Sequence, residues 1–441
     1  MQIAVIGTGY VGLVTGACFA EFGVDVLCFD IDKEKIERLT QGHMPIYEPG
    51  LEQLVEKNTQ AGRLKFTINL KAAVESSLVV LLAVGTPQGA DGAADLSAVE
   101  AAARSIASYI NDYKVIVTKS TVPVGTGEHL RRIIGEENKN AKFGMVSNPE
   151  FLREGAAIGD FMRPDRVVIG SRDARAVEII KDLYRPLYLI ETPFVITSME
   201  GAELTKYAAN AFLATKISFI NEIANLCDLI GCDVHDVARA LGMDNRIGKK
   251  FLHPGPGFGG SCFPKDTSAL LSIARKYDYD ALIVDAVVRV NQRQRELMVP
   301  KIERLVGDLR GKTIAVLGLA FKPGTDDMRE APSVDIIRVL LERGATVRAY
   351  DPIAMDAARE SLPAITYVED EYEAVAGADA LVFMTEWNQF RALNMRRVHE
   401  LMRAPKIADL RNIYEPEAMA ELGFEYVGVG RQTQKRAEAR G

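Results

Sequence analysis

The N-terminal part of the chain alternates short apolar runs with segments whose apolar residues recur at helical spacing. Residues 2–7 (QIAVIG) and 25–30 (DVLCFD) have the length and β-branched content of buried strands, and helical spacing fills the interval between them. Further strand-like runs occupy residues 78–87, 114–121, 143–150 and 166–171. Strand, helix and strand in this order predict a parallel sheet with helices on both faces.

The pattern changes from Met199 to Pro300, where helical periodicity replaces the strand-like runs. Residues 199–231 form one proline-free helical segment, and residues 267–297 form a second helical stretch. The first segment is long enough to join two domains, and its apolar content indicates that it also packs against other parts of the protein.

A second unit of strand, glycine turn, helix and strand begins near residue 311. Both units end their second strand with an aspartate, Asp30 and Asp351, but the second unit has a longer loop around residues 321–330. Later strand-like runs at residues 380–386 and 406–412 continue this sheet.

The predicted fold is α/β, with two doubly wound Rossmann-like domains joined by a long central helix and a helical linker domain. The expected divisions are an N-terminal doubly wound domain at 1–198, a central helical domain at 199–300, a C-terminal doubly wound domain at 301–430 and a polar tail at 431–441.

Composition narrows the range of partners. The chain has 441 residues, of which 48% are hydrophobic, and a formal net charge of −7, which argues against nucleic acid or an anionic membrane as the main partner. We find no secretory signal and no apolar run of the roughly 18 residues that a membrane span requires. The five cysteines are scattered, unlike a disulfide framework, so we expect a cytoplasmic protein with reduced thiols.

A G-x-G-x-x-G motif of Gly7, Gly9 and Gly12 follows the first strand and opens the first helix. Such a turn lets a pyrophosphate approach backbone N–H groups at a helix N-terminus. Asp30 ends the next strand, where a carboxylate can bind ribose hydroxyls and repel a 2′-phosphate, which favours NAD over NADP. The alternative is a glycine turn without a ligand. Lys35 is a candidate contact for the adenosine end, or a solvated surface lysine.

Small hydroxyl residues and carboxylates follow other strand-like runs. Thr86 and Thr121 are candidates for the cofactor cleft, because ligands of open α/β sheets bind at the carboxyl ends of strands, although plain turn chemistry would also explain them. Glu150 and Glu154 stand four residues apart, a spacing that suits acid–base chemistry but also a solvated helix face.

Lys206 and Asn210 are also four residues apart and share one face of the long helix. A lysine and an amide in this position could stabilise an oxygen that develops negative charge. A surface pair would have the same spacing.

Cys262 lies in residues 255–266 (GPGFGGSCFPKD), a run too rich in glycine and proline for a core helix or a central strand. Cys18 and Cys227, in contrast, occupy apolar segments typical of buried structural thiols. Lys265 would lower the pKa of a nearby thiol, and the thiolate is the nucleophile. No histidine or cysteine stands at metal-ligand spacing. A nucleophilic cysteine with NAD favours oxidation of an aldehyde through a thiohemiacetal and a thioester.

Five segments in order resemble the UDP-glucose/GDP-mannose dehydrogenase superfamily over essentially the whole chain: IGTGYVGLVTG, KSTVPVGT, NPEFLREG, GPGFGGSCFPKD and FKPGTDDMREAPS. The resemblance implies a four-electron oxidation of UDP-glucose to UDP-glucuronate with two NAD and water. It also implies a C-terminal domain that binds the UDP moiety and a homodimer built on the central helix.

The resemblance further implies roles for the matching residues. The implied catalytic residues are Cys262 as nucleophile, Lys206 and Asn210 for oxyanions, Asp266 for protons and water, Glu150 as the base for hydrolysis and Thr121 to position water. The implied cofactor contacts are Gly7, Gly9, Tyr10, Val11, Gly12, Asp30, Lys35, Thr86, Thr121, Glu154, Lys265 and Arg329. The implied substrate contacts are Glu150, Phe151, Leu152, Arg153, Glu154, Lys206, Asn210, Phe251, Gly255, Gly259, Lys322 and Arg246, which in the family can reach across the dimer.

Other functions remain open on the sequence alone. A GDP-mannose or UDP-N-acetylhexosamine 6-dehydrogenase would use the same chemistry on another sugar nucleotide. A non-catalytic nucleotide-sugar-binding protein would keep the fold without turnover, but it would need neither Cys262 nor its polar neighbours. A single-step β-hydroxyacid dehydrogenase would share the N-terminal domain and the helical linker, without the second α/β domain.

Overall fold

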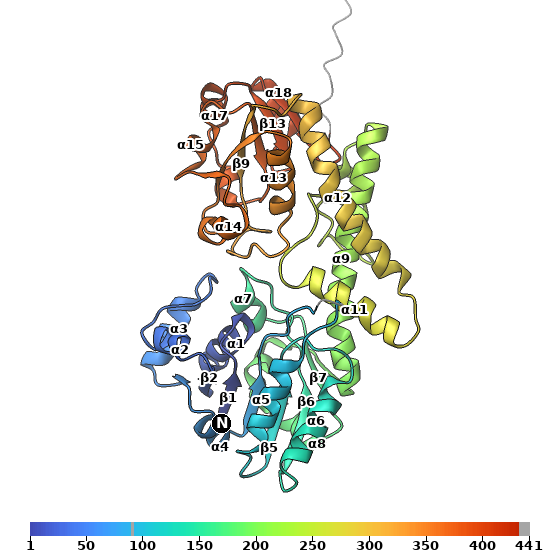
Figure 1. The fold of residues 1–441 in the computed structure, drawn as a ribbon. Helices are drawn as coiled ribbons and strands as arrows, with labels where there is room; N and C mark the ends of the chain where they lie inside the picture. Colours follow the sequence, from blue (N-terminus) through green and yellow to red (C-terminus); the bar gives the residue numbers. More distant parts are fainter. Residues whose placement is uncertain (90–91, 432–441) are drawn as a thin grey trace, which may run out of the picture. The chain divides into compact units, whose positions relative to one another are not determined.

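The computed structural model of the protein describes residues 1–89 and 92–431. These residues form two compact units, one of residues 1–209 with 268–279 and one of residues 210–267 with 280–431. The division falls inside helix α9 (Met199–Ile230), which Figure 1 shows as one long helix. The expected polar tail lies outside the described residues, apart from Arg431.

The first unit is built on an eight-stranded sheet with the order β3-β2-β1-β4-β5-β6-β7-β8. Its strands are β1 (Gln2–Ile6), β2 (Asp25–Phe29), β3 (Leu64–Thr67), β4 (Val79–Leu82), β5 (Lys114–Thr118), β6 (Phe143–Ser147), β7 (Val167–Gly170) and β8 (Phe194–Thr197). The first six strands pair in parallel; five of them lie in the predicted strand-like runs, and β3 is not predicted. β7 runs antiparallel to β6 and parallel to β8, so the sheet is mixed at this edge.

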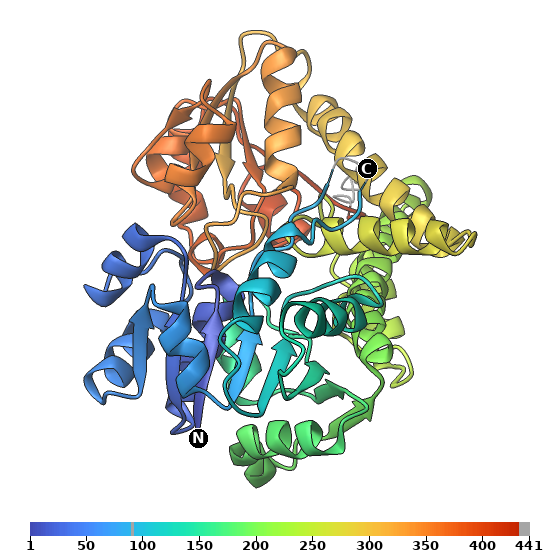
Figure 2. The same ribbon diagram turned by 60° about the horizontal axis from the view of Figure 1, so that its bottom comes forward.

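Helices cover both faces of this sheet (Figures 1 and 2). They are α1 (Tyr10–Glu21), α2 (Lys33–Thr40), α3 (Leu51–Gln60), α4 (Leu70–Ser76), α5 (Ser97–Ala107), α6 (Thr126–Glu137), α7 (Ala157–Met162), α8 (Ala174–Leu183) and the 3-10 helix η1 (Arg185–Ile190). Alternate strand residues point to opposite faces. Ile3 and Val5 therefore pack with α1, α3, α7 and α8, whereas Ala4 and Ile6 pack with α4, α5 and α6.

The second unit contains a six-stranded parallel sheet with the order β11-β10-β9-β12-β13-β14. Its strands are β9 (Thr313–Leu317), β10 (Thr346–Tyr350), β11 (Thr366–Tyr367), β12 (Ala380–Phe383), β13 (Lys406–Asp409) and β14 (Glu425–Gly428). Its further helices are α10 (Val234–Met243), α12 (Leu282–Val306), α13 (Pro332–Glu342), α14 (Met355–Ser361), α15 (Glu371–Val375), α16 (Asn388–Arg391), α17 (Met395–Leu401) and α18 (Pro416–Glu421). Both predicted doubly wound domains are confirmed.

Two details of the helical region differ from the prediction. The stretch 267–297 is two helices, α11 (Phe263–Lys276) and α12, because Asp278 adopts a left-handed φ of 53° in the turn between them. The run 255–266 is irregular only as far as Cys262, since α11 begins at Phe263. Pro264 is tolerated there because the first turn of a helix needs no N–H donor at this position.

Candidate active site

The glycine turn between β1 and α1 has the geometry of a dinucleotide site. Gly7 has a φ of 99°, and a Cβ at Gly12 would lie 1.9 Å from the Gly7 carbonyl oxygen, so both positions require glycine. A Cβ at Gly9 would meet nothing within 4 Å, and Gly9 precedes α1 without any side-chain cap. Open space in front of uncapped N–H groups fits the pyrophosphate of a dinucleotide.

Asp30 lies at the carboxyl end of β2, beside this turn. Its Oδ2 accepts hydrogen bonds from the Thr8 N–H at 2.8 Å and the Thr8 hydroxyl at 2.7 Å, and it lies 3.0 Å from Lys35 Nζ. Burial raises the pKa of Asp30, but these hydrogen bonds lower it more, so the net shift is downward. The structure thus brings the predicted residues Asp30 and Lys35 together as an ion pair.

The equivalent aspartate of the second unit already has all its hydrogen bonds from protein groups. Asp351 is fully buried, and its carboxylate accepts hydrogen bonds from five donors. These donors are the N–H groups of Leu319, Ala320, Ile353 and Ala354 and the Nε1–H of Trp387. Because protein groups occupy its oxygens, Asp351 stabilises the second unit and offers no acceptor to a ribose.

Buried Glu48 joins the glycine turn to the loop after β6. Its Oε2 accepts hydrogen bonds from the Tyr10 hydroxyl at 2.5 Å and the Gly155 N–H at 2.6 Å, and its Oε1 accepts from the Ala157 N–H at 2.8 Å. Burial and the bond to Glu48 raise the pKa of Tyr10, which therefore stays a neutral donor. Nothing in the sequence around Glu48 signals this contact.

Glu150 and Lys206 form a buried ion pair with 2.9 Å between Lys206 Nζ and Glu150 Oε1. Glu150 follows β6 and also accepts a hydrogen bond from the Leu152 N–H, while Lys206 projects from α9. Burial raises the pKa of Glu150, but Lys206 and this hydrogen bond outweigh it and leave that pKa below its ordinary value. The solvated-face and surface-pair alternatives are wrong for these two residues.

The two predicted threonines lie together at the carboxyl ends of β4 and β5. The Thr86 hydroxyl donates a hydrogen bond to the Thr121 carbonyl at 2.8 Å. Nearby, the Ser120 hydroxyl donates to the Val84 carbonyl at 2.6 Å. The turns after the two strands are therefore held to each other at the edge where ligands of such sheets bind.

In the second unit, three predicted residues converge one helical turn after Cys262. Buried Asp266 accepts a hydrogen bond from Asn210 Nδ2 at 2.6 Å and pairs with Lys265 Nζ at 2.7 Å. Its backbone N–H donates to the Cys262 carbonyl at 2.8 Å. The half-buried Cys262 has its Sγ 3.5 Å from the Ser261 hydroxyl. Cys18 and Cys227 are buried, as predicted.

Side chains of α12 hold the run that precedes Cys262. Asn291 Oδ1 accepts from the Phe258 N–H at 2.8 Å, and Asn291 Nδ2 donates to the Phe258 carbonyl at 3.1 Å. Arg295 Nη2 donates to the same carbonyl at 2.8 Å, and Gln294 Nε2 donates to the Gly255 carbonyl at 2.8 Å. Sequence reasoning missed these three residues, whose one signal is polar side chains spaced along a single helix face.

The same run lies against the loop after β9. A Cβ at Gly259 would stand 2.2 Å from the Glu330 carbonyl oxygen, and the Gly260 N–H donates to the Arg329 carbonyl at 2.9 Å. Arg295 Nη2 also donates to the Glu330 carbonyl, at 3.0 Å. Gly259 is therefore required by close backbone packing within the protein.

Several other residues predicted to contact ligands form ion pairs or ring contacts within the protein. Three predicted arginines pair with nearby carboxylates: Arg153 with Asp160, Arg246 with Asp244 and Arg329 with Asp327. The ring of Phe151 lies 3.6 Å from the Arg166 guanidinium and 5.4 Å from Lys206 Nζ, and Lys322 Nζ lies 5.2 Å from the Phe321 ring centre. Phe251 has a left-handed φ of 65°.

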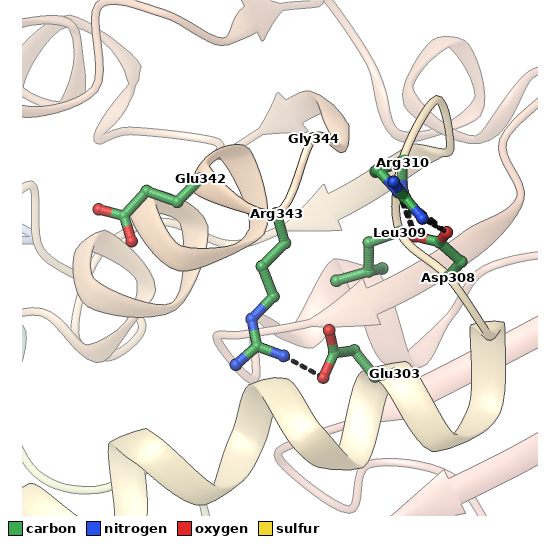
Figure 3. Close-up of a pocket in the computed structure, with 7 residues that line it drawn as sticks. All are labelled: Glu303, Asp308, Leu309, Arg310, Glu342, Arg343 and Gly344. Carbon is green, nitrogen blue, oxygen red and sulfur yellow. Dashed lines mark hydrogen bonds and ion pairs between the residues drawn. The ribbon is translucent and has the colours of Figure 1, made fainter.

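A separate pocket of the second unit contains none of the predicted residues (Figure 3). It is lined by Glu303, Asp308, Leu309, Arg310, Glu342, Arg343 and Gly344. Arg310 pairs with Asp308 and Arg343 pairs with Glu303, so its cations are already neutralised. The pocket is a poor match for a ligand as negatively charged as a nucleotide.

Among the described residues, no helix combines the length and the apolar character needed to cross a membrane.

Comparisons with known proteins identify the family. Three models of the UDP-glucose/GDP-mannose dehydrogenase family match in succession: the NAD binding domain at residues 1–188, the central domain at 200–293 and the UDP binding domain at 315–416. A UDP-glucose 6-dehydrogenase of Rhizobium meliloti (strain 1021) is 54% identical over 435 residues, which cover 98% of this chain and 100% of that protein. UDP-glucose 6-dehydrogenase TuaD of Bacillus subtilis (strain 168) is 50% identical over 439 residues, or 99% of this chain and 95% of that protein.

A solved structure agrees with these relatives. A UDP-glucose dehydrogenase from the hyperthermophilic archaeon Pyrobaculum islandicum superimposes with a TM-score of 0.90 at 41% identity, covering 97% of each chain. With three family models in order and relatives of this identity over nearly its whole length, the chain belongs to the UDP-glucose/GDP-mannose dehydrogenase family and is an NAD-dependent oxidoreductase.

Proposed function

We propose that this protein oxidises the C6 hydroxyl of UDP-glucose to a carboxylate, giving UDP-glucuronate. The observations that carry the proposal are the buried Lys206–Glu150 pair of the first unit and the Asn210–Asp266 hydrogen bond of the second unit, one helical turn after Cys262. This set of groups suits a reaction that passes through a carbonyl and a cysteine adduct.

NAD bound at the glycine turn of Gly7, Gly9 and Gly12 would supply the hydride acceptor for each of two oxidations. In the first oxidation C6 loses a hydride and its hydroxyl loses a proton, which leaves an aldehyde. The Cys262 thiol then loses its proton, its sulfur forms a bond to C6, and the former carbonyl oxygen takes up a proton. The resulting thiohemiacetal loses a second hydride and its hydroxyl proton to become a thioester. Water adds to C6, the C–S bond breaks, and the products are the carboxylate and the free thiol.

The polar groups have separate tasks in this scheme. Lys206 and Asn210 donate to the C6 oxygen while it carries negative charge. Glu150, ionised because Lys206 pairs with it, accepts a proton from the attacking water, and Thr121 positions that water. Asp266 takes part in proton transfer next to Cys262.

The remaining contacts are also proposals. For NAD they are Gly7, Gly9, Tyr10, Val11, Gly12, Asp30, Lys35, Thr86, Thr121, Glu154, Lys265 and Arg329. For the sugar nucleotide they are Glu150, Phe151, Leu152, Arg153, Glu154, Lys206, Asn210, Arg246, Phe251, Gly255, Gly259 and Lys322. We assign NAD binding to residues 1–198, the helical linker to 199–300 and UDP binding to 301–430, in a protein of the cytoplasm.

The proposed homodimer would form along α9. Phe212, Phe219 and Leu226 recur every seven residues and are 66%, 48% and 49% exposed. A stripe of large apolar side chains on one helix face is typical of a protein interface. The molar mass in solution tests this, with Phe212→Ser and Phe219→Ser together expected to give monomers; an unchanged mass would place the interface elsewhere.

The decisive experiment for the reaction is stoichiometric. Limiting UDP-glucose with excess NAD should give two NADH per sugar, and UDP-glucuronate should accumulate. One NADH per sugar with free aldehyde would contradict the thioester route. Faster turnover of GDP-mannose or a UDP-N-acetylhexosamine would favour the related 6-dehydrogenases instead, and binding without NADH would indicate a non-catalytic protein.

A further inference from the structure

Lys119 is a buried cation that the proposed reaction does not use. It follows β5 and is 4% exposed. Its Nζ donates to Asn148 Oδ1 at 3.0 Å and to the Tyr184 hydroxyl at 3.0 Å, and that hydroxyl donates to the same Asn148 oxygen at 2.7 Å. These two partners are neutral, so neither of them balances the charge of Lys119.

Glu150, a residue of the proposed site, is the carboxylate that acts on the charge of Lys119. Asn148 stands two residues before Glu150, whose carboxylate pairs with Lys206 on α9. Lys206 also acts on the charge of Lys119, and Tyr184, after α8, is its hydrogen-bond partner; Cys18 of α1 acts in turn on Tyr184. Burial raises the pKa of the Cys18 thiol to about 12 and raises the pKa of Tyr184 as well, so both are neutral. Two ammonium groups and one carboxylate therefore share this buried region.

We propose that Lys119 is a positioning residue that supplies the second positive charge of the Glu150–Lys206 site, keeping Glu150 ionised and leaving the site with an excess of positive charge. Such a site can accept the negative charge that develops on the C6 oxygen without losing the carboxylate that serves as base. This inference rests on the proposed function, because it concerns the same two residues.

The electrostatics of the site agree with this role. Burial lowers the pKa of Lys119 to about 8, while Glu150 raises it and Lys206 lowers it. Lys119 is thus still mostly charged at neutral pH. In turn, Lys119 is among the groups that lower the pKa of Glu150, after Lys206 itself. Because the two groups interact, removing the charge of Lys119 should shift the pKa of Glu150.

The alternative is that Lys119 only ties the Asn148 loop to Tyr184. The two roles separate in three variants. Lys119→Met removes the charge, Lys119→Arg keeps it, and Tyr184→Phe removes the hydroxyl that Lys119 binds while leaving the charge in place. Lys119→Gln is a second neutral variant in case the Met variant fails to fold.

The test is the pH dependence of kcat with UDP-glucose and NAD. The neutral variants should move the midpoint of the acidic limb upward by about one pH unit, because Glu150 loses a neighbouring cation, and should lower kcat about tenfold with little change in KM. Lys119→Arg and Tyr184→Phe should keep the wild-type midpoint. An unshifted acidic limb in the neutral variants, or the same shift in Tyr184→Phe, would overturn the proposal.

A second measurement does not depend on activity. The folded-state pKa of Lys119, about 8, lies below its ordinary value of 10.5, so between these values the unfolded chain binds more protons and stability rises with pH. The Tm of the wild type minus that of Lys119→Met should therefore increase from pH 8 to pH 10. A constant difference would mean that folding does not lower the pKa of Lys119. Failure of the proposed function would instead be seen in the wild type, as missing NADH.

Discussion

Lys206 Nζ lies 2.9 Å from Glu150 Oε1, and both side chains are buried. One residue comes from a loop after β6 and the other from α9, so the pair joins the sheet of the first unit to the long helix. Two charges removed from water are costly unless each satisfies the other. The pair therefore links the stability of this unit to the chemistry proposed for it.

Glu150→Gln should abolish thioester hydrolysis and destabilise the protein. The amide cannot accept a proton from water, and it leaves Lys206 buried without its counter-charge, which costs about 3–5 kcal/mol. Chemical denaturation at pH 7 measures the loss. The pKa of Glu150 is lowered on folding, so its stabilisation is present above the ordinary value of 4.5 and is lost as pH falls below it. The difference between wild type and variant should shrink on acidification; a constant difference would show that folding does not lower the pKa of Glu150.

Cys262→Ser should keep cofactor binding and lose complete turnover. A serine hydroxyl is a far weaker nucleophile than a thiolate, so the reaction should stop at a tightly held product of the first oxidation. Rapid-mixing measurements should find no more than one NADH per site and an unchanged dissociation constant for NAD. Cys232→Ser, a change at a half-buried thiol of the second unit, is the matched control. Wild-type turnover by Cys262→Ser would remove this residue from the mechanism.

Asn291→Ala should slow the reaction. Asn291 is not one of the predicted contacts, but it holds the backbone of residues 255–262, the run that ends at Cys262. The substitution leaves the buried N–H of Phe258 without its acceptor, at a cost of about 1–3 kcal/mol. We expect kcat to fall more than the KM for NAD rises, together with a lower rate of Cys262 alkylation. The exposed neighbour Gln292, changed to alanine, should alter neither quantity. Equal effects of the two substitutions would deny Asn291 a positioning role.

The difference between what the sequence predicts and what it misses has a physical basis. Gly7, Gly12 and Asp30 are needed for a turn, a close backbone approach and a strand end. Each of these features depends on residues close together in the sequence, so a short motif is enough to predict it. Glu48 and Lys119 form hydrogen bonds with residues distant in the sequence. The sequence around a single glutamate or lysine does not indicate whether its side chain is buried.

The same limit explains the error in the helical region. Helical periodicity continues through residues 267–297, because apolar spacing records which face is buried and not whether the backbone is continuous. The left-handed conformation of Asp278 interrupts the helix without interrupting that pattern. Aspartate adopts this conformation more readily than most residues, but it does so too rarely to serve as a predictive signal.

Glu203→Gln should remove a pH dependence of stability. Glu203 projects from α9, and its two carboxylate oxygens accept hydrogen bonds from the Gly125 and Gly127 N–H groups, each at 2.7 Å, at the start of α6. Burial raises the pKa of Glu203 to about 7. A carboxyl with a raised pKa stabilises the fold below its ordinary value of 4.5, and that stabilisation is lost as pH rises toward 7.

In the Gln variant no proton is exchanged at this position. The Tm of the wild type should therefore fall relative to that of Glu203→Gln between pH 5 and pH 7, in thermal melts at constant ionic strength. Glu200→Gln, one turn earlier on α9, should leave this relative change in place. A parallel Tm profile of wild type and Glu203→Gln would mean that Glu203 is ionised throughout this range, and that the two N–H groups of the α6 turn hold it as a carboxylate in spite of its burial.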